Sequence, residues 1–197
     1  MFMPLGSVSS ISAGYPLRHS AEELAEGSIS FVQLKNVSLE RGIVWDEVAK
    51  IDLPSTRNQS WLSPRDVIFA ARGSRTLAYP VINPPERAAC APHFYVVSVS
   101  DHAELLPEFL AWQMNQKAAQ DYLQREATGS YILNIRRQAL EQLPIAIPPV
   151  REQELIVAYW RAAQRERLTL ERLIETTEAQ LGAIAMRLAT IEQGRAA

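Results

Sequence analysis

The sequence is poor in the residues that build cross-linked or metal-held frameworks. It has one cysteine, Cys90, and three histidines, His19, His93 and His102, among 197 residues. A single cysteine excludes a disulfide framework and any site made of several cysteines, and it suits the reducing cytoplasm. Since the histidines form no pair four residues apart, the sequence predicts no metal site.

Long apolar runs are missing as well. No stretch approaches the ~18 uninterrupted apolar residues that a membrane-spanning helix needs. The opening residues, MFMPLGSVSS, lack the basic region and apolar run of a signal peptide. We therefore expect a cytoplasmic protein without a membrane partner.

The motifs of common enzyme classes are also absent. The eight glycines form neither a P-loop nor a dinucleotide-binding signature, and there is no G-x-S-x-G motif. Asn83–Glu86 is close to the tetrapeptide of DNA amino-methyltransferases, but a glutamate stands where those enzymes have an aromatic residue that stacks on the flipped base. The acid–lysine core of PD-(D/E)xK nucleases is missing too. The chain is therefore predicted to bind rather than to catalyse, with no catalytic residues and no cofactor.

Charge is nearly balanced overall but uneven along the chain. The net charge is −2, which argues against general binding to nucleic acid. Residues 57–75 contain four arginines, Arg57, Arg65, Arg72 and Arg75, and only one acid, Asp66. This segment predicts either a local cationic patch or an ordinary solvated face.

The first 149 residues predict a mixed α/β (α+β) domain. Residues 1–100 show short strand-like runs and turns, including a buried strand over Val67–Ala70. Residues 78–92 hold four prolines and predict an irregular loop. A single helix is expected from Pro107 to Glu126, because apolar residues recur there every four positions.

A heptad pattern follows Pro148–Pro149, where we place the boundary between domain 1–149 and a dimerising or spacer helix over 150–197. Nine of its eleven core positions are apolar, which is typical of a coiled coil. These positions, here called the heptad seam, are Ile156, Trp160, Ala163, Arg167, Leu170, Ile174, Thr177, Leu181, Ile184, Leu188 and Ile191. At 1.5 Å per residue the seam would span roughly 54 Å. A stripe of this kind is expected to pair with a second copy, or else to fold back on its own domain.

The segment Gly129–Val157 resembles the specificity subunits of type I restriction–modification systems. In that family a glycine and spaced Ile and Leu residues precede a Pro-Pro, Glu-Gln, Ile signature that opens a long helix. The matching residues here are Gly129, Ile135, Leu140, Leu143, Ile145, Pro148, Pro149, Glu152, Gln153 and Ile156. Looser likenesses lie at Leu5–Gly14, at Phe31–Val37 and at Arg65–Gly73, where Arg65 replaces the usual glycine.

The resemblance implies a non-catalytic subunit that binds double-stranded DNA and docks a DNA adenine methyltransferase subunit. Whether a restriction (translocase) subunit also joins the complex is left open by the resemblance. The family usually carries two recognition domains and two long helices, whereas this chain has one of each. A homodimer through the C-terminal helix would restore the pair and would recognise a gapped palindromic site. Its half-site centres would lie no more than about 16 base pairs apart. Glu152 and Gln153 are interpreted as helix-start residues that could face a partner subunit.

Polar and cationic residues on expected loops are the candidates for DNA contact. Arginine suits guanine, and asparagine or glutamine suits adenine, because each can make two hydrogen bonds to the base edge. The candidates are Tyr15, Arg18, His19, Lys35, Asn36, Arg57, Asn58, Gln59, Arg72, Ser74, Arg75, Ser130 and Tyr131. Of these, Arg57, Arg72 and Arg75 are the strongest, although Arg72 could instead hold its own turn.

Two other functions remain open from the sequence. A coiled-coil scaffold for protein partners, without DNA binding, would explain the seam equally well. An accessory domain of a larger enzyme is the remaining alternative.

Overall fold

The computed structural model describes residues 2–16, 27–52, 61–73, 76–129 and 133–195, with side chains as far as Arg187. The chain divides into two compact units, Met1–Tyr159 and Trp160–Ala197. The first is the predicted mixed α/β domain, and the second consists of most of the predicted long helix.

A four-stranded antiparallel sheet forms the centre of the first unit. Its order is β2 (Ser9–Ala13), β11 (Phe94–Val99), β7 (Asp66–Ala70) and β9 (Ala78–Pro80). The register places Val97 of β11 between Ile11 and Val67, so three aliphatic side chains share one face. Strand β7 contains the buried run Val67–Ala70 that the sequence predicts.

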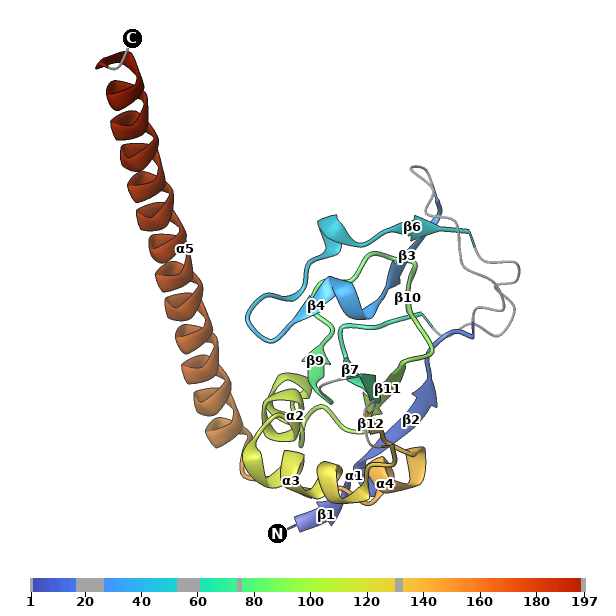
Figure 1. Cartoon of the computed structure of the whole chain (residues 1–197). Helices are drawn as coiled ribbons and strands as arrows, with labels where there is room; N and C mark the ends of the chain where they lie inside the picture. Colours follow the sequence, from blue (N-terminus) through green and yellow to red (C-terminus); the bar gives the residue numbers. More distant parts are fainter. Residues whose placement is uncertain (1, 17–26, 53–60, 74–75, 130–132, 196–197) are drawn as a thin grey trace. The chain divides into compact units, whose positions relative to one another are not determined.

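Helices cover one face of this sheet (Figure 1). They are α1 (Leu5–Val8), α2 (Pro107–Met114), α3 (Lys117–Glu126) and α4 (Arg137–Glu141). Phe69 and Val97 from the sheet pack with Leu110, Leu123 and Leu140 from the helices. Each of these five side chains is fully excluded from solvent, so this cluster is the first core.

A smaller sheet covers part of the other face (Figure 1). Its order is β10 (Ala88–Cys90), β3 (Ile29–Val32) and β6 (Lys50–Ile51), with β10 and β3 parallel. Phe31 and Ile51 from this sheet pack against Ile68 and Phe94 from the central sheet. The result is a second core on the opposite side of β7.

Three two-stranded ladders complete the unit. They are β1 (Phe2–Pro4) with β13 (Pro144–Ala146), β4 (Val37–Ser38) with β5 (Gly42–Ile43), and β8 (Arg72–Gly73) with β12 (Leu133–Asn134). Two 3-10 turns flank the β4–β5 hairpin, η1 (Leu34–Asn36) and η2 (Trp45–Glu47).

Two local expectations are wrong. The helix expected over Pro107–Glu126 is two helices, because the chain leaves helical geometry at Gln116, whose ψ is 157°. The proline-rich stretch 78–92 is not wholly irregular, since it contains β9 and β10. Both strands are three residues long, too short to show a clear pattern; β9 pairs with the nearby β7, and β10 pairs with the distant β3.

Amide side chains fasten short segments to the helices. The side chain of Asn115 accepts a hydrogen bond from the backbone N–H of Ala78 and donates one to its carbonyl, both at 2.8 Å. Gln113 makes the same pair of bonds with the backbone of Ala146, at 2.8 and 3.0 Å. An amide can do this because it carries both a donor and an acceptor. These contacts, here called the amide clamps, supply β9 and β13 with the partners that a further strand would otherwise give.

The long helix α5 (Val150–Arg195) begins directly after Pro149, as predicted. Gln153 in its first turn is fully buried. Its amide accepts from the N–H of Leu106 and donates to the carbonyls of Glu104 and Pro148. The idea that Gln153 could face a partner is therefore wrong, because its side chain is a third amide clamp within the first unit. Among the described residues, no helix combines the length and apolarity needed to cross a bilayer.

We expect Gln153→Leu to lower the free energy of unfolding by about 2–4 kcal/mol, because the change removes three hydrogen bonds between a buried amide and part-buried backbone groups. Urea denaturation measures this against Glu154→Gln, an exposed neighbour expected to change stability by less than about 0.5 kcal/mol. Equal midpoints for the two variants would contradict the clamp.

Cys90 gives a chemical test of the second core. Burial raises the pKa of its thiol from an ordinary value of 9.0 to about 12, and the charge of Asp66 adds to the rise. At pH 8 the reactive thiolate should therefore be about a thousandfold scarcer than for an exposed cysteine. We expect a coloured disulfide reagent to label the native protein far more slowly than the urea-unfolded protein. Equal rates would show that the β10 side of this core opens readily.

Candidate nucleic-acid interface

The strongest described candidate, Arg72, lies on the β8–β12 ladder. Arg72 is exposed and pairs with Asn134 in the register of the two strands. Its Nε donates to Asn134 Oδ1 at 3.1 Å, which uses one of the five guanidinium N–H groups. Arg72 therefore helps to hold its own ladder, as the sequence left open, while most of its donors are not used by that bond.

Several other candidates adjoin this ladder in sequence. Ser74 and Arg75 follow β8 directly, and Ser130 and Tyr131 come shortly before β12, but all four lie outside the described residues. Gly129, with φ of 98°, is the last described residue before that gap. Thr128 and Asn134 form a pair of backbone hydrogen bonds at 3.0 Å. The structure thus shows that the Arg72 and Gly129 segments meet in one ladder.

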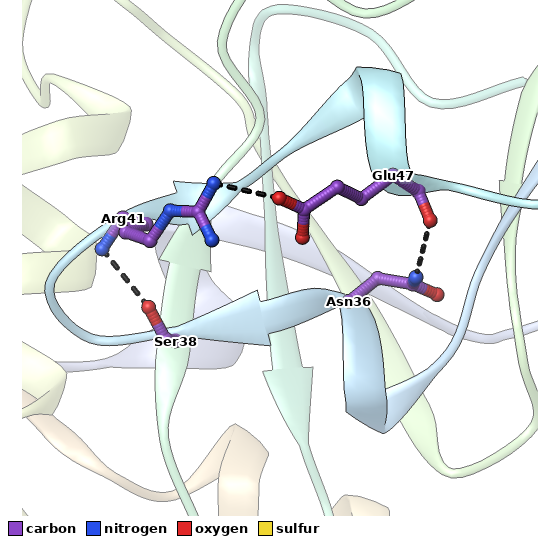
Figure 2. A network of polar contacts seen from close by, with 4 residues as sticks. All are labelled: Asn36, Ser38, Arg41 and Glu47. Atoms are coloured by element: carbon purple, nitrogen blue, oxygen red, sulfur yellow. Dashed lines mark hydrogen bonds and ion pairs between the residues drawn. The ribbon is translucent and has the colours of Figure 1, made fainter. Parts of the chain in front are cut away.

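The β4–β5 hairpin carries a second pair of candidates, Lys35 and Asn36. Lys35 is exposed on η1, whereas Asn36 is buried. The Asn36 amide donates to the Glu47 carbonyl at 3.0 Å and accepts from the N–H of Gln33 at 2.9 Å. Figure 2 shows the bond to Glu47 closing the base of the hairpin. In this structure Asn36 stabilises the hairpin, and its role as a base-reading residue stays a prediction.

Arg41 is a cation at the hairpin turn that our sequence reasoning did not select. Its Nη2 lies 2.7 Å from Glu47 Oε1, and its backbone N–H donates to Ser38 Oγ at 3.0 Å (Figure 2). Both charged side chains are about half exposed, at 51% and 57%, so the pair adds little stability. The one indication in the sequence was an arginine directly before a glycine, a residue that favours turns. In the structure that glycine, Gly42, has a φ of +65°.

The hairpin and the ladder border one another. A cavity of about 290 Å³ is lined by Leu34, Val37 and Glu40 from the hairpin side and by Arg72 and Tyr79 from the other. Arg72 therefore lines this groove directly, whereas Lys35 only follows the lining residue Leu34 in the sequence.

The candidate Tyr15 lines a second cavity, not the groove beside Arg72. Its backbone N–H donates to the Cys90 carbonyl at 2.8 Å, just after Gly14. A Cβ on Gly14 would lie 2.1 Å from the Ala91 carbonyl oxygen, so only glycine allows this close approach. Tyr15 thereby lines a cavity of about 710 Å³, together with Trp61 and Arg65.

Five more candidates adjoin this second cavity in sequence. Arg18 and His19 follow soon after Pro16, which lines it, and Arg57, Asn58 and Gln59 shortly precede Trp61. All five lie outside the described residues. Trp61 and Arg65 lie at the cavity itself but are absent from the candidates. The sequence did contain an indication for Arg65, because this residue falls within the arginine-rich stretch 57–75.

The described residues contain no group of three or more His, Cys, Asp or Glu side chains placed to hold a metal ion. In the tetrapeptide Asn83–Glu86, Asn83 has a positive φ of 46°, and the preceding Ile82 carbonyl accepts from Trp45 Nε1 at 2.7 Å. The tetrapeptide therefore belongs to a turn that the indole holds in place.

The heptad seam is described on α5 for its first nine positions. Ile156 is half-buried and packs against the first core, and Trp160 is half-buried. Leu170, Ile174, Leu181 and Ile184 are 53%, 57%, 62% and 55% exposed. Ala163, Arg167 and Thr177 are exposed too. The side chains of Leu188 and Ile191 lie outside the described residues.

The two polar seam positions bond within their own helix. Arg167 Nε lies 3.1 Å from Glu171 Oε1, and Thr177 Oγ1 donates to the Leu173 carbonyl at 2.8 Å. These local bonds keep both side chains close to the helix surface.

Comparison with known proteins identifies the fold and the family. No curated protein matches the chain. Solved structures of similar fold include the S subunit of a type I restriction-modification system from M. genitalium, at 17% identity and a TM-score of 0.54 over 81% of this chain and 37% of that one. The HsdS subunit from Thermoanaerobacter tengcongensis is 20% identical, with a TM-score of 0.58 over 87% of this chain and 39% of that one.

A third structure, of a type I R-M system described for its complex assembly and conformational transition, is 22% identical, with a TM-score of 0.65 over 93% and 43% of the two chains. The chain thus spans 37–43% of the length of these three structures. The family model of the type I restriction modification DNA specificity domain matches residues 1–177. Because that match covers far more than half of the sequence, the chain belongs to the family of type I restriction–modification DNA specificity domains.

Proposed function

We propose that this chain is a non-catalytic subunit that recognises a DNA sequence for a type I restriction–modification system. The family match over residues 1–177 is the observation that carries the proposal. The two groups of candidates support it: one adjoins Arg72 on the β8–β12 ladder, and the other adjoins Tyr15 and Trp61. In the sequence, most members of both groups fall between the short strands and helices of the first unit, where a rigid scaffold can present side chains to a duplex.

Docking of a DNA adenine methyltransferase subunit is part of the same proposal, and a restriction subunit could join it. Recognition without catalysis needs a partner that performs the chemistry, and the resemblance in sequence names the methyltransferase. The described residues at the two groups of candidates include arginine and aromatic side chains, which are binding groups.

Two copies of the chain would pair through the heptad seam. Four aliphatic seam side chains are more than half exposed along the described part of α5. Burying seven large apolar seam residues from one chain is worth on the order of 10–20 kcal/mol before ordering costs. Two identical domains related by a two-fold axis would recognise identical half-sites in opposite orientation, which is a gapped palindrome.

We expect the full-length protein to enrich one sequence from a pool of random duplexes, with binding that weakens as salt rises because phosphate contacts release counterions. Arg72→Ala should weaken binding to the enriched duplex by about 1–3 kcal/mol if the side chain contacts a base. Gel shifts at two salt concentrations measure both effects. Arg137→Ala is the matched control, since Arg137 is exposed and bonded to Glu141 on α4. The absence of any shift, even with a methyltransferase subunit added, would contradict DNA recognition and favour a protein scaffold.

We expect the wild-type chain to sediment as a dimer and the variant Ile174→Asp with Leu181→Asp to sediment as a monomer. The two changes remove four buried aliphatic side chains per dimer, worth about 6–12 kcal/mol. The control is Ala179→Asp with Met186→Asp, which adds the same charge at exposed positions outside the seam. A monomeric wild type, or equal behaviour of the two variants, would refute pairing through the seam.

A further inference from the structure

A polar cavity of about 710 Å³ opens on the central sheet of the first unit. Ser10, Ser12 and Ser98 lie on its floor, on strands β2 and β11. In the register of the sheet, Ser10 pairs with Ser98, and Ser12 pairs with Val96. The floor therefore carries three hydroxyl groups on two adjacent strands, with Val96 beside Ser12.

The cavity exists because the two faces of β2 differ in chemistry. Successive side chains on a strand point to opposite faces. Ile11 points into the first core and is 4% exposed, whereas its neighbours Ser10 and Ser12 point away from that core and are exposed. The smaller sheet packs over Ile68 and Phe94, and among the described residues Ser10 and Ser12 stay exposed beside it. Serines in place of aliphatic residues leave this part of the sheet open to a polar ligand.

The walls add aromatic, cationic and imidazole groups. Tyr15 and Trp61 are half-buried and pack partly against the second core, so their rings are fixed at the edge of the cavity. Arg65 is exposed and also lines the cavity. His102 lines it too, and its Nδ1 is buried and makes no hydrogen bond with any described group.

The floor also contains one negative charge, which is already engaged. Asp66 is 5% exposed, and its carboxylate accepts hydrogen bonds from Ser98 Oγ and from the N–H of Ser63. This charge disfavours an anionic group deep in the cavity. An anion would bind at the rim beside Arg65, and a neutral, acceptor-rich group would occupy the serine floor.

Size and chemistry together define the ligand class. A volume of this order suits one small molecule, and it is too small for a duplex. Aromatic walls, several hydroxyl donors and acceptors, and one rim cation match a planar heterocycle joined to a single phosphate. We propose that the serine-floored cavity binds one unstacked nucleotide, with the base near Tyr15 and Trp61 and the phosphate near Arg65.

Within the proposed function, this nucleotide would come from the recognised duplex, turned out of the base stack. Turning a base out carries an energetic penalty, and a prepared cavity offsets it. That part rests on DNA recognition, whereas binding of a free nucleotide does not.

The first experiment titrates the full-length protein with the four deoxynucleoside 5′-monophosphates and follows tryptophan fluorescence. We expect at least one of them to bind, and Ser12→Phe to weaken it about tenfold or more, because the ring fills the floor and excludes the stacked base. Gln124→Phe is the matched control, since Gln124 is exposed on α3 and does not line the cavity. If no nucleotide binds, or if Ser12→Phe binds as well as the control, the cavity is not a nucleotide site.

The second experiment uses the enriched duplex with 2-aminopurine placed at each adenine or guanine position in turn. We expect one position to show a several-fold rise in fluorescence with wild type and with Gln124→Phe. Ser12→Phe should still shift the duplex in a gel but should lose the rise. A shifted duplex with no rise at any position would refute extrusion from the duplex and leave a site for free nucleotides. Nucleotide binding with no duplex shift would overturn the proposed function and retain the cavity assignment.

Discussion

The first unit depends on amide side chains that bond to backbone. Its strands are short, and the outermost ones have no neighbouring strand to satisfy their N–H and C=O groups, which are costly to bury alone. Asn115 and Gln113 extend α2 toward β9 and β13, and Gln153 ties the start of α5 to the chain before α2. The Gln120 amide donates to the Thr76 carbonyl at 2.7 Å and so fastens the segment that follows β8. The helices thus position the strands through hydrogen bonds as well as through apolar packing.

Sequence reasoning succeeded where the determinants were local. The Pro-Pro stop, the long helix that follows it and the buried run of β7 each depend on neighbours within a few residues, and each appears in the structure as predicted. It failed where the partner was remote. The break at Asn115 places its side chain against Ala78, 37 positions away, and no helical periodicity reports such a bond. Strand β10 in the proline-rich stretch has the same cause, since its partner β3 is remote in the sequence.

Prediction of the candidate site likewise succeeded for local features and failed for those that depend on remote contacts. Arginine-rich composition and a glycine turn pointed to Arg72, which the structure places on an exposed ladder. Residue type alone also pointed to Asn36, but its amide is used by the Glu47 carbonyl eleven positions along the chain. Trp61 carried no signal in the sequence, because its place beside the serine floor follows from the pairing of β2 with β11. Local residue type could suggest which groups bind, and only the topology could show where they gather.

The amide clamps have a consequence for how this domain can change over evolutionary time. Each one contacts main-chain atoms of the segment that it holds, so the identity of the held residue matters little to the bond. Ala78 and Ala146 could each be replaced without loss of their clamps, provided that the new side chain fits its surroundings. Mutational drift can therefore alter those segments, and the turns that adjoin them, while the scaffold stays the same. A fold held in this way tolerates diversification of its surface at little cost in stability.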